Sequence, residues 1–397
     1  MNAICIISKI RGKHESDPEG AKRPTSRSAT REFTSRAERE PVSPLFDKIV
    51  QFSNASSCLS WFAGMWLIVG IAILTALTGC GGSEVVAYIS VDQPFAEPIL
   101  ASFTARTGII VRPLFDTEAA KTVGIVSRLR AETARPQADV FWNSEFAHTF
   151  QLAREGLFES YSPPTASDIP TMYRDPKGFW TCIGARACVL LINTDLVASG
   201  TEPKRLIDLV SNRWQPGQVA VSSPLFGTGL THAAAMYAES GEAAMLDFFV
   251  RLKRNGGLFL DGNALVRDRI VAGALPCGLI DSDDALVALT HHAPVKMILP
   301  DQGPNGSGTL LIPNSVSLIK RAPHPQEARM LVDFLVSAEN EILLAQGESR
   351  QIPVRPHLQS KCGWLPPEGV KAYPTPLQNI AGALGSSSFA LKNLFLK

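Results

Sequence analysis

The stretch 281–284, Asp-Ser-Asp-Asp, is the first place where residue types and spacing could do chemistry. It follows the apolar run 278–280, as when a buried strand ends at a cleft, and α/β sheets bind ligands at such carboxyl ends. Because the three carboxylates repel one another, we expect a positive charge to face at least one of them. The alternative is a solvated acidic turn that caps a helix over 285–290, since Asp is a good N-cap residue.

Two other polar side chains could reach the same cleft. Arg186 begins an apolar strand, and its alternative role is a salt bridge to Asp139 or another nearby acid. Asn263 follows Asp-Gly and opens a helix, so we expect an N-cap that can also point inward. We expect His232 to be a surface or capping residue rather than a ligand.

Composition limits the class of protein. A chain of 397 residues exceeds one typical domain, so two lobes are the default expectation. The net charge of +1 gives no case for a nucleic-acid partner. The seven cysteines form no C-x-x-C pair, which argues against a zinc site and a disulfide scaffold. No common hydrolase, metalloprotease or phosphate-loop motif is present, although Glu145 with Asp283 could do acid–base chemistry in an enzyme.

The N-terminal part is predicted to contain a targeting segment. Residues 1–60 are expected to be a disordered or wrongly annotated extension. The uncharged run that begins at Trp61 ends in Leu77-Thr78-Gly79-Cys80, which resembles a bacterial lipobox. That resemblance implies a lipoprotein signal peptide over 61–80, lipidation of Cys80 and a membrane-anchored protein outside the cytoplasm. An uncleaved signal anchor is the alternative.

Strands and helices alternate in the rest of the chain, the pattern of a parallel sheet with helices on both faces. In the first part we expect strands at 84–89, 109–115 and 138–142 and helices at 94–107, 119–134 and 145–155. In the second part we expect strands at 185–192, 219–222 and up to 281, a strand-rich stretch at 309–318, and helices at 206–214, 233–239, 245–255, 263–273, 326–336 and 338–345. Beyond residue 366 we expect a poorly patterned tail.

Several segments, in this order and spacing, resemble the iron(III)-type family of periplasmic solute-binding proteins, the ligand-capturing subunits of ABC importers. They are residues 138–158, 184–197, 224–236, 276–289, 295–335 and 351–356. The resemblance implies an α/β, two-lobed periplasmic-binding-protein fold. Each lobe is a mainly parallel sheet flanked by helices, and two crossover segments near 184–189 and 307–313 join them. The implied lobes are 83–185 with 308–365, and 186–307, followed by the tail 366–397.

The same resemblance implies the partners and the site. We expect ABC permease and ATPase subunits as partners, no cofactor and a monomer. The implied ligand-binding residues are Asp92, Thr117, Glu118, Ser144, Glu145, Arg186, Gly227, Thr228, Gly229, Asn263, Asp283 and Asp284. Among these, the suspected metal ligands are Asp92, Glu145, Asp283 and Asp284. Free N–H groups at the helix that Gly227 opens suit an anion.

One departure from the family leaves the ligand open. Iron(III) binders usually carry two adjacent tyrosines where this chain has Asp283 and Asp284. Carboxylates could still hold iron(III) or another metal with a companion anion. They could equally hold an organic cation or a zwitterion such as an aminoalkylphosphonate. Adjacent residues at a strand end point to opposite sides, so we expect only one of the two aspartates to touch the ligand strongly.

Overall fold

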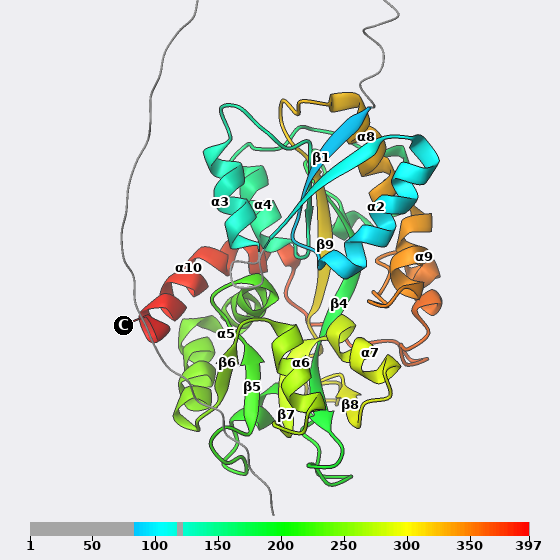
Figure 1. Ribbon diagram of the computed structural model, residues 1–397. Helices are drawn as coiled ribbons and strands as arrows, with labels where there is room; N and C mark the ends of the chain where they lie inside the picture. The colour runs from blue at the N-terminus through cyan, green and yellow to red at the C-terminus, as the bar shows by residue number, and fades with distance from the viewer. Residues whose placement is uncertain (1–82, 117–121, 397) are drawn as a thin grey trace, which may run out of the picture. The chain divides into compact units, whose positions relative to one another are not determined.

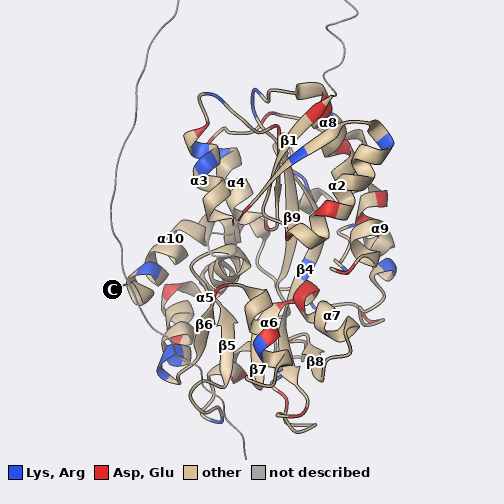
Figure 2. Ribbon diagram, in the orientation of Figure 1, with Lys and Arg blue, Asp and Glu red and all other residues tan. Residues whose placement is uncertain are grey.

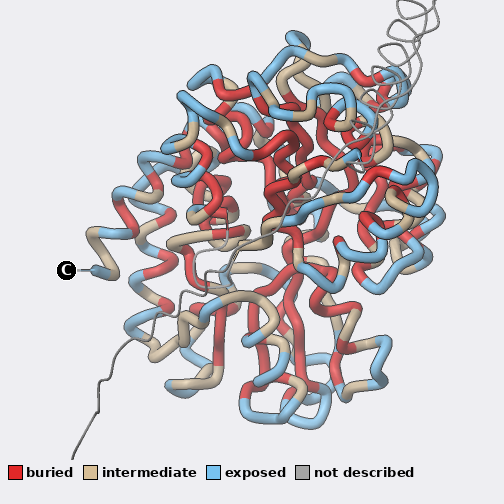
Figure 3. The backbone as a smooth tube through the Cα atoms, turned by 45° about the horizontal axis from the view of Figure 1, so that its top comes forward, coloured by how far each residue is buried: buried red, intermediate tan, exposed pale blue. Residues whose placement is uncertain are grey.

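In the computed structural model, which describes residues 83–116 and 122–396, nine strands form one hydrogen-bonded sheet. The strand order is β2-β1-β3-β9-β4-β7-β5-β6, and β8 pairs with β4. Buried backbone concentrates along the central strands of this sheet (Figure 3). In the described part of the chain, no helix is long and apolar enough to cross a membrane. The predicted lipobox and Cys80 lie outside the described residues.

The first half of the sheet is a β-α-β-α-β-α series, as predicted. Strand β1 (Glu84–Ile89) pairs in parallel with β2 (Ile110–Phe115) and with β3 (Val140–Asn143). The helices that follow these strands are α2 (Gln93–Thr107), α3 (Val123–Ala131) and α4 (Ala147–Arg154). Because the three strands are parallel, the residues that follow them meet at one edge of the sheet.

The second half repeats this plan. Strand β5 (Val219–Ser222) pairs in parallel with β6 (Leu258–Leu260) and with β7 (Cys277–Asp281). The helices of this half are α5 (Gly227–Arg254), α6 (Asn263–Val271) and α7 (Ser282–Thr290). Strand β8 (Val295–Ile298) pairs antiparallel to β4. The sequence did not predict β6 or β8, which have three and four residues.

Two long strands connect the halves (Figure 1). The first part of β4 (Thr181–Asn193) pairs with β9 (Leu311–Leu318) as far as Ala187, and from Cys188 onward β4 pairs with β7 instead. All residues of β4 are buried. Its register shifts at Gly184, whose φ of 33° and bulged geometry suit glycine. One strand therefore belongs to both halves, as expected for a crossover.

The C-terminal part differs from the expected tail. After α8 (Pro325–Leu335) and α9 (Ala338–Gln346), the chain forms helix α10 (Leu377–Phe395). Its buried residues recur at helical spacing, and this face packs on α5 and α4 (Figure 1). Glycines and serines obscured the pattern because they are poor helix formers. Short 3-10 turns span Pro164–Ala166, Thr171–Tyr173, Leu206–Val210 and Pro356–Cys362.

Helix α5 contains the two helices that were expected at 233–239 and 245–255, because the backbone at Gly241 is not helical and divides it. The first of the two begins at Gly227, six residues before the predicted start at 233. The Gly-Thr-Gly segment is therefore its first turn, as the resemblance implied. The first turn of α5 follows β5 and lies at the carboxyl edge of the second half of the sheet.

Candidate functional site

A pocket lies where the carboxyl ends of strands from both halves meet. It contains most of the residues that the sequence predicted as ligand-binding. The predicted residues that line it are Asp92, Ser144, Arg186, Gly227, Thr228, Gly229, Asn263, Asp283 and Asp284. The lining residues that were not predicted as ligand-binding are Ser222, Ser223, Phe226, Gly262 and Asp281. We call this the cleft pocket. Thr117 and Glu118 lie outside the described residues.

One wall of the cleft pocket is the first turn of α5, and its glycines have physical reasons to be there. Gly227 has a φ of 56°, a conformation that side chains other than glycine rarely adopt. At Gly229 a Cβ atom would overlap the carbonyl oxygen of Ser223. The close approach of the β5 end to the helix therefore requires glycine. Amide groups in the first turn of a helix lack intrahelical acceptors and favour negative charge.

Asn263 joins this wall from a neighbouring helix. Gly262, not Asn263, occupies the N-cap position of α6, and Asn263 is the first helical residue. The Asn263 Nδ2 atom donates to Thr228 Oγ1 at 3.3 Å. The predicted N-cap role was wrong by one position, whereas the predicted inward orientation is present.

The opposite wall is acidic and comes from the end of β7 and the start of α7. Helix α7 begins at Ser282, three residues earlier than predicted, and Asp283 and Asp284 lie in its first turn. In Figure 2 this acidic first turn lies beside α6. Neighbouring residues on a helix are about 100° apart, so both aspartates line the cleft pocket. The premise that they alternate on a strand was wrong.

Arg186 supplies the positive charge that the acidic stretch implied. Its side chain is buried, and its Nε atom lies 3.7 Å from Oδ2 of Asp281 and 3.7 Å from Oδ2 of Asp283. Its Nη2 atom donates to the carbonyl oxygen of Ser144, across the pocket. Asp139 is not its partner, because that carboxylate binds His324 and two backbone amides. Burial alone lowers the pKa of Arg186, but the surrounding carboxylates outweigh burial and raise it.

A second arginine contacts the acidic wall. Arg267 Nη1 on α6 lies 2.8 Å from Oδ1 of Asp284. The sequence gave no reason to select Arg267, because the rotation of a helix about its axis decides which of its polar residues faces a neighbouring helix.

Glu145 does not line the cleft pocket. Its fully buried carboxylate accepts hydrogen bonds from five donors: the Ala147 and His148 amides, His148 Nδ1, Asn143 Nδ2 and Thr231 Oγ1. A carboxylate has about four lone-pair sites, so no capacity remains for a metal. Burial raises the pKa of Glu145, but His148 and Asn143 outweigh that and lower it. Within the described residues, no group of three or more His, Cys, Asp or Glu is arranged to hold a metal ion.

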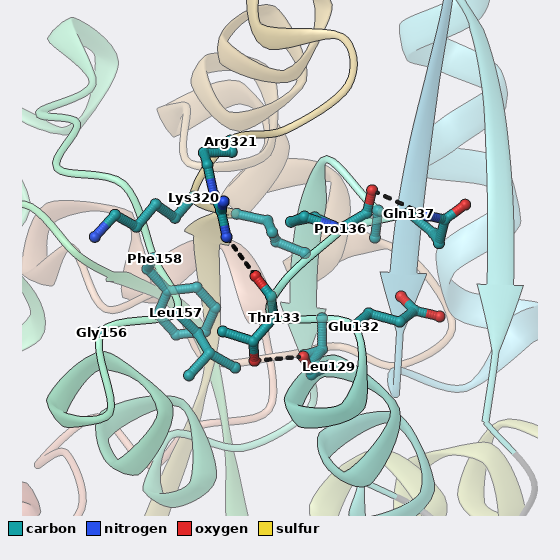
Figure 4. A pocket seen from close by; sticks show the side chains of 12 residues that line it. Leu129, Glu132, Thr133, Pro136, Gln137, Gly156, Leu157, Phe158, Lys320 and Arg321 are labelled. Atoms are coloured by element: carbon teal, nitrogen blue, oxygen red, sulfur yellow. Dashed lines mark hydrogen bonds between the residues drawn. The ribbon is translucent and has the colours of Figure 1, made fainter.

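The cleft pocket is narrow, with a cavity volume of about 30 Å³. A larger cavity of about 370 Å³ lies elsewhere, and none of the predicted site residues in the described part of the chain lines it. Its wall includes Leu129, Leu157 and Phe158, and Arg321 Nη2 donates to the carbonyl of Thr133 at 2.5 Å (Figure 4). We call it the outer pocket.

Residues 136–364 match the family described as bacterial extracellular solute-binding protein. Because this match spans more than half of the sequence, the chain belongs to that family. Its members are solute-binding transport proteins, so the chain is a binding protein and the enzyme alternative is set aside.

Individual relatives agree with this family. The chain is 26% identical over 263 residues to iron uptake protein A1 of Synechocystis, with 62% of this chain and 69% of the relative covered. It is 23% identical over 271 residues to a putative 2-aminoethylphosphonate-binding periplasmic protein of Salmonella typhimurium, with 66% and 75% covered. The crystal structure of iron-bound HitA from Pseudomonas aeruginosa superposes with a TM-score of 0.69 at 23% identity, with 78% and 99% covered.

These findings confirm the two-lobed α/β fold and the solute-binding class. The role is therefore solute binding in ABC import, in the periplasm or outside the cell, with permease and ATPase subunits as partners.

Proposed function

We propose that this protein captures a small zwitterionic solute for an ABC importer, with the anionic group of the solute at the start of α5 and its cationic group at the acidic wall. An aminoalkylphosphonate is an example of such a solute. The observation that carries the proposal is the arrangement of charge. The cleft pocket places a helix N-terminus opposite aspartates from β7 and α7.

Arg186 and Arg267 already pair with three of the aspartates of the cleft pocket, Asp281, Asp283 and Asp284. Less uncompensated negative charge therefore remains for a trivalent ion than in a site made of carboxylates alone. None of the described residues that line the cleft pocket is a tyrosine. A relative named for 2-aminoethylphosphonate binding supports the proposal.

Iron(III) or another metal with a companion anion is the second candidate. Relatives and solved structures are named for iron uptake or iron binding, and carboxylates are suitable hard ligands. The narrow cleft pocket also suits an ion. Asp92, Asp283 and Asp284 would then provide the metal ligands, and Glu145 would not, for the reason given above.

The test is thermal and urea unfolding of the protein with 2-aminoethylphosphonate or with ferric citrate. A true ligand at 100 times its dissociation constant adds about 2.7 kcal/mol to the free energy of unfolding. We expect 2-aminoethylphosphonate to stabilise the protein and Asp283→Asn to abolish that effect. The control is Asp247→Asn, a change at an exposed carboxylate. Stabilisation by ferric citrate alone would favour the second candidate, and stabilisation by neither compound would reject the zwitterion.

Capture by closure of two lobes is part of the same proposal. The exchange of partners of β4 between Ala187 and Cys188 supports lobes at 83–185 with 308–365, and at 186–307. We also propose a lipid anchor on Cys80, supported by the sequence Leu77-Thr78-Gly79-Cys80, and a monomeric state. Cys80→Ser should release the protein from the membrane fraction, which fractionation and intact mass would measure.

A further inference from the structure

Thr231 lies in the second turn of α5, and no part of its side chain is exposed. Its hydroxyl group is within hydrogen-bonding distance of two acceptors. Its Oγ1 atom is 3.1 Å from Oε2 of Glu145 and 3.4 Å from the carbonyl oxygen of Gly227. Glu145 follows β3 in the first half of the sheet, whereas α5 belongs to the second half. The contact with Glu145 therefore connects the two halves, and the contact with Gly227 stays within α5.

The Glu145 side of this contact is held in place. Besides Thr231, the carboxylate accepts hydrogen bonds from Asn143, from the amides of the first turn of α4 and from His148. The backbone is also restrained, because Ser315 Oγ donates to the Glu145 carbonyl at 2.8 Å. All of these partners belong to the first half of the sheet or to its helices. Glu145 is thus a fixed acceptor that keeps its orientation without Thr231.

The Thr231 side adjoins the ligand-binding turn. Gly227 and Thr228 line the cleft pocket one helical turn earlier on α5. A threonine hydroxyl in a helix commonly donates to the carbonyl four residues earlier. A bond to a carboxylate is roughly twice as strong as that neutral bond. The hydroxyl therefore has a strong partner across the halves and a weaker one in its own helix.

We propose that Thr231 is a positioning residue of solute capture: its hydroxyl binds Glu145 when the two lobes are together and turns to the Gly227 carbonyl when they separate. The proposal rests on the lobe closure in the proposed function. It assigns to Glu145 the role of a latch for α5 in place of the metal-ligand role that the sequence suggested. The bond places the first turn of α5 against the first lobe, where the anionic group of the solute would be held.

Thr231→Val tests this with little change in shape, because valine has similar volume but cannot donate. Thr231→Ser restores the hydroxyl group. The matched control is Thr149→Val, since Thr149 is equally buried and bonded to the same network, but only to Asn143 and Ser315 in its own half. Small-angle scattering of the protein without ligand reports lobe separation. Stopped-flow dissociation of 2-aminoethylphosphonate reports capture.

We expect Thr231→Val to increase the ligand-free radius of gyration and to speed dissociation about tenfold, as loss of a hydrogen bond to a charged group predicts. Thr231→Ser should behave like the unmodified protein. Thr149→Val should lower the melting temperature without changing the radius. An unchanged radius in Thr231→Val, or an equal increase in Thr149→Val, would overturn the proposal. If 2-aminoethylphosphonate does not bind, the zwitterion proposal fails and the scattering result still decides the role of Thr231.

Discussion

The cleft pocket and the outer pocket differ in the way that they hold charge. The outer pocket is about 370 Å³ against about 30 Å³ for the cleft pocket. Yet its basic residues, Lys320 and Arg321, are exposed to solvent. In the cleft pocket, Arg186 and three aspartates are 5% exposed or less. Burying charged groups costs free energy of folding unless partners compensate them. The smaller cavity is therefore the one in which the protein keeps buried charges in place with paired partners.

The difference shows that cavity size is a poor guide to the site in this protein. The charged residues that line the outer pocket include Lys320 and Arg321 at its exposed wall. A set of buried charges from strands β4 and β7 and helix α7 requires specific residues. Substitutions of matched residues in the two pockets test this difference.

The largest effect is expected from Arg186→Met. Removing the guanidinium leaves the buried Asp281 and Asp283 without their shared cation, and breaking a buried ion pair costs about 3–5 kcal/mol. Urea unfolding at pH 7 measures the change. Arg321→Met in the outer pocket is the control and should cost less than about 1 kcal/mol. Equal losses in the two variants would erase the distinction between the pockets.

Gly229→Ala should have the next largest effect. The added Cβ meets the Ser223 carbonyl, and overpacking of this kind costs about 1–3 kcal/mol. The same change at Gly382, on the exposed face of α10 with nothing within 4 Å, should instead stabilise by about 0.5–1 kcal/mol through helix propensity. Thermal unfolding distinguishes the expected loss of stability in Gly229→Ala from the expected gain in Gly382→Ala. A neutral Gly229→Ala would mean that the end of β5 can move away from α5.

Low pH should weaken the hydrogen bonds that the buried carboxylate of Glu145 accepts. Because the folded state holds the pKa of Glu145 below its ordinary value, ionised Glu145 contributes stability above its unfolded pKa of about 4.3. That contribution is lost as the pH falls through the folded pKa. Urea midpoints between pH 7 and pH 3 should fall less steeply in Glu145→Gln than in the unmodified protein. The exposed Glu368→Gln gives the baseline, and parallel curves for all three proteins would refute this role.

The smallest effect is expected from Lys320→Ala in the outer pocket. An exposed side chain of this kind contributes within about 0.5 kcal/mol, and solute affinity should not change. Isothermal titration with 2-aminoethylphosphonate, or with ferric citrate if that compound binds, measures the affinity. A loss of affinity would show that the outer pocket takes part in capture and would remove the basis of the comparison.

Much of the fold was predictable because strands and helices alternate with clear periodicity. The strands at 84–89 and 219–222 have the predicted limits. The prediction failed where periodicity was weak or mixed. Helix α10 contains glycines and serines, and its buried face became evident only from its packing on α5 and α4. The two predicted helices of α5 are present on either side of the non-helical Gly241, but the first begins six residues before its predicted start.

The site was predictable where strand ends and glycines mark it. Residues 227–229 and the aspartates Asp281, Asp283 and Asp284 stand out from the sequence and meet in one pocket. Ser222 and Ser223 were missed, although their place at the end of the predicted strand 219–222 was a usable signal. The resemblance selected Glu145 after β3, but its carboxylate accepts hydrogen bonds from the amides at the start of α4. Whether the Glu145 side chain points into the cleft or binds the start of α4 depends on three-dimensional contacts.

Helix α10 lies beyond residue 364, where the match to the family ends. A version of the protein that ends at residue 364 would lose the helix that packs on both α4 and α5. The apolar side chains that now pack on Ile380, Leu384 and Leu391 would face water in a single strip along both helices. Extracytoplasmic proteases and chaperones recognise such surfaces, so we expect the shortened chain to be cleared by quality control before any question of transport arises.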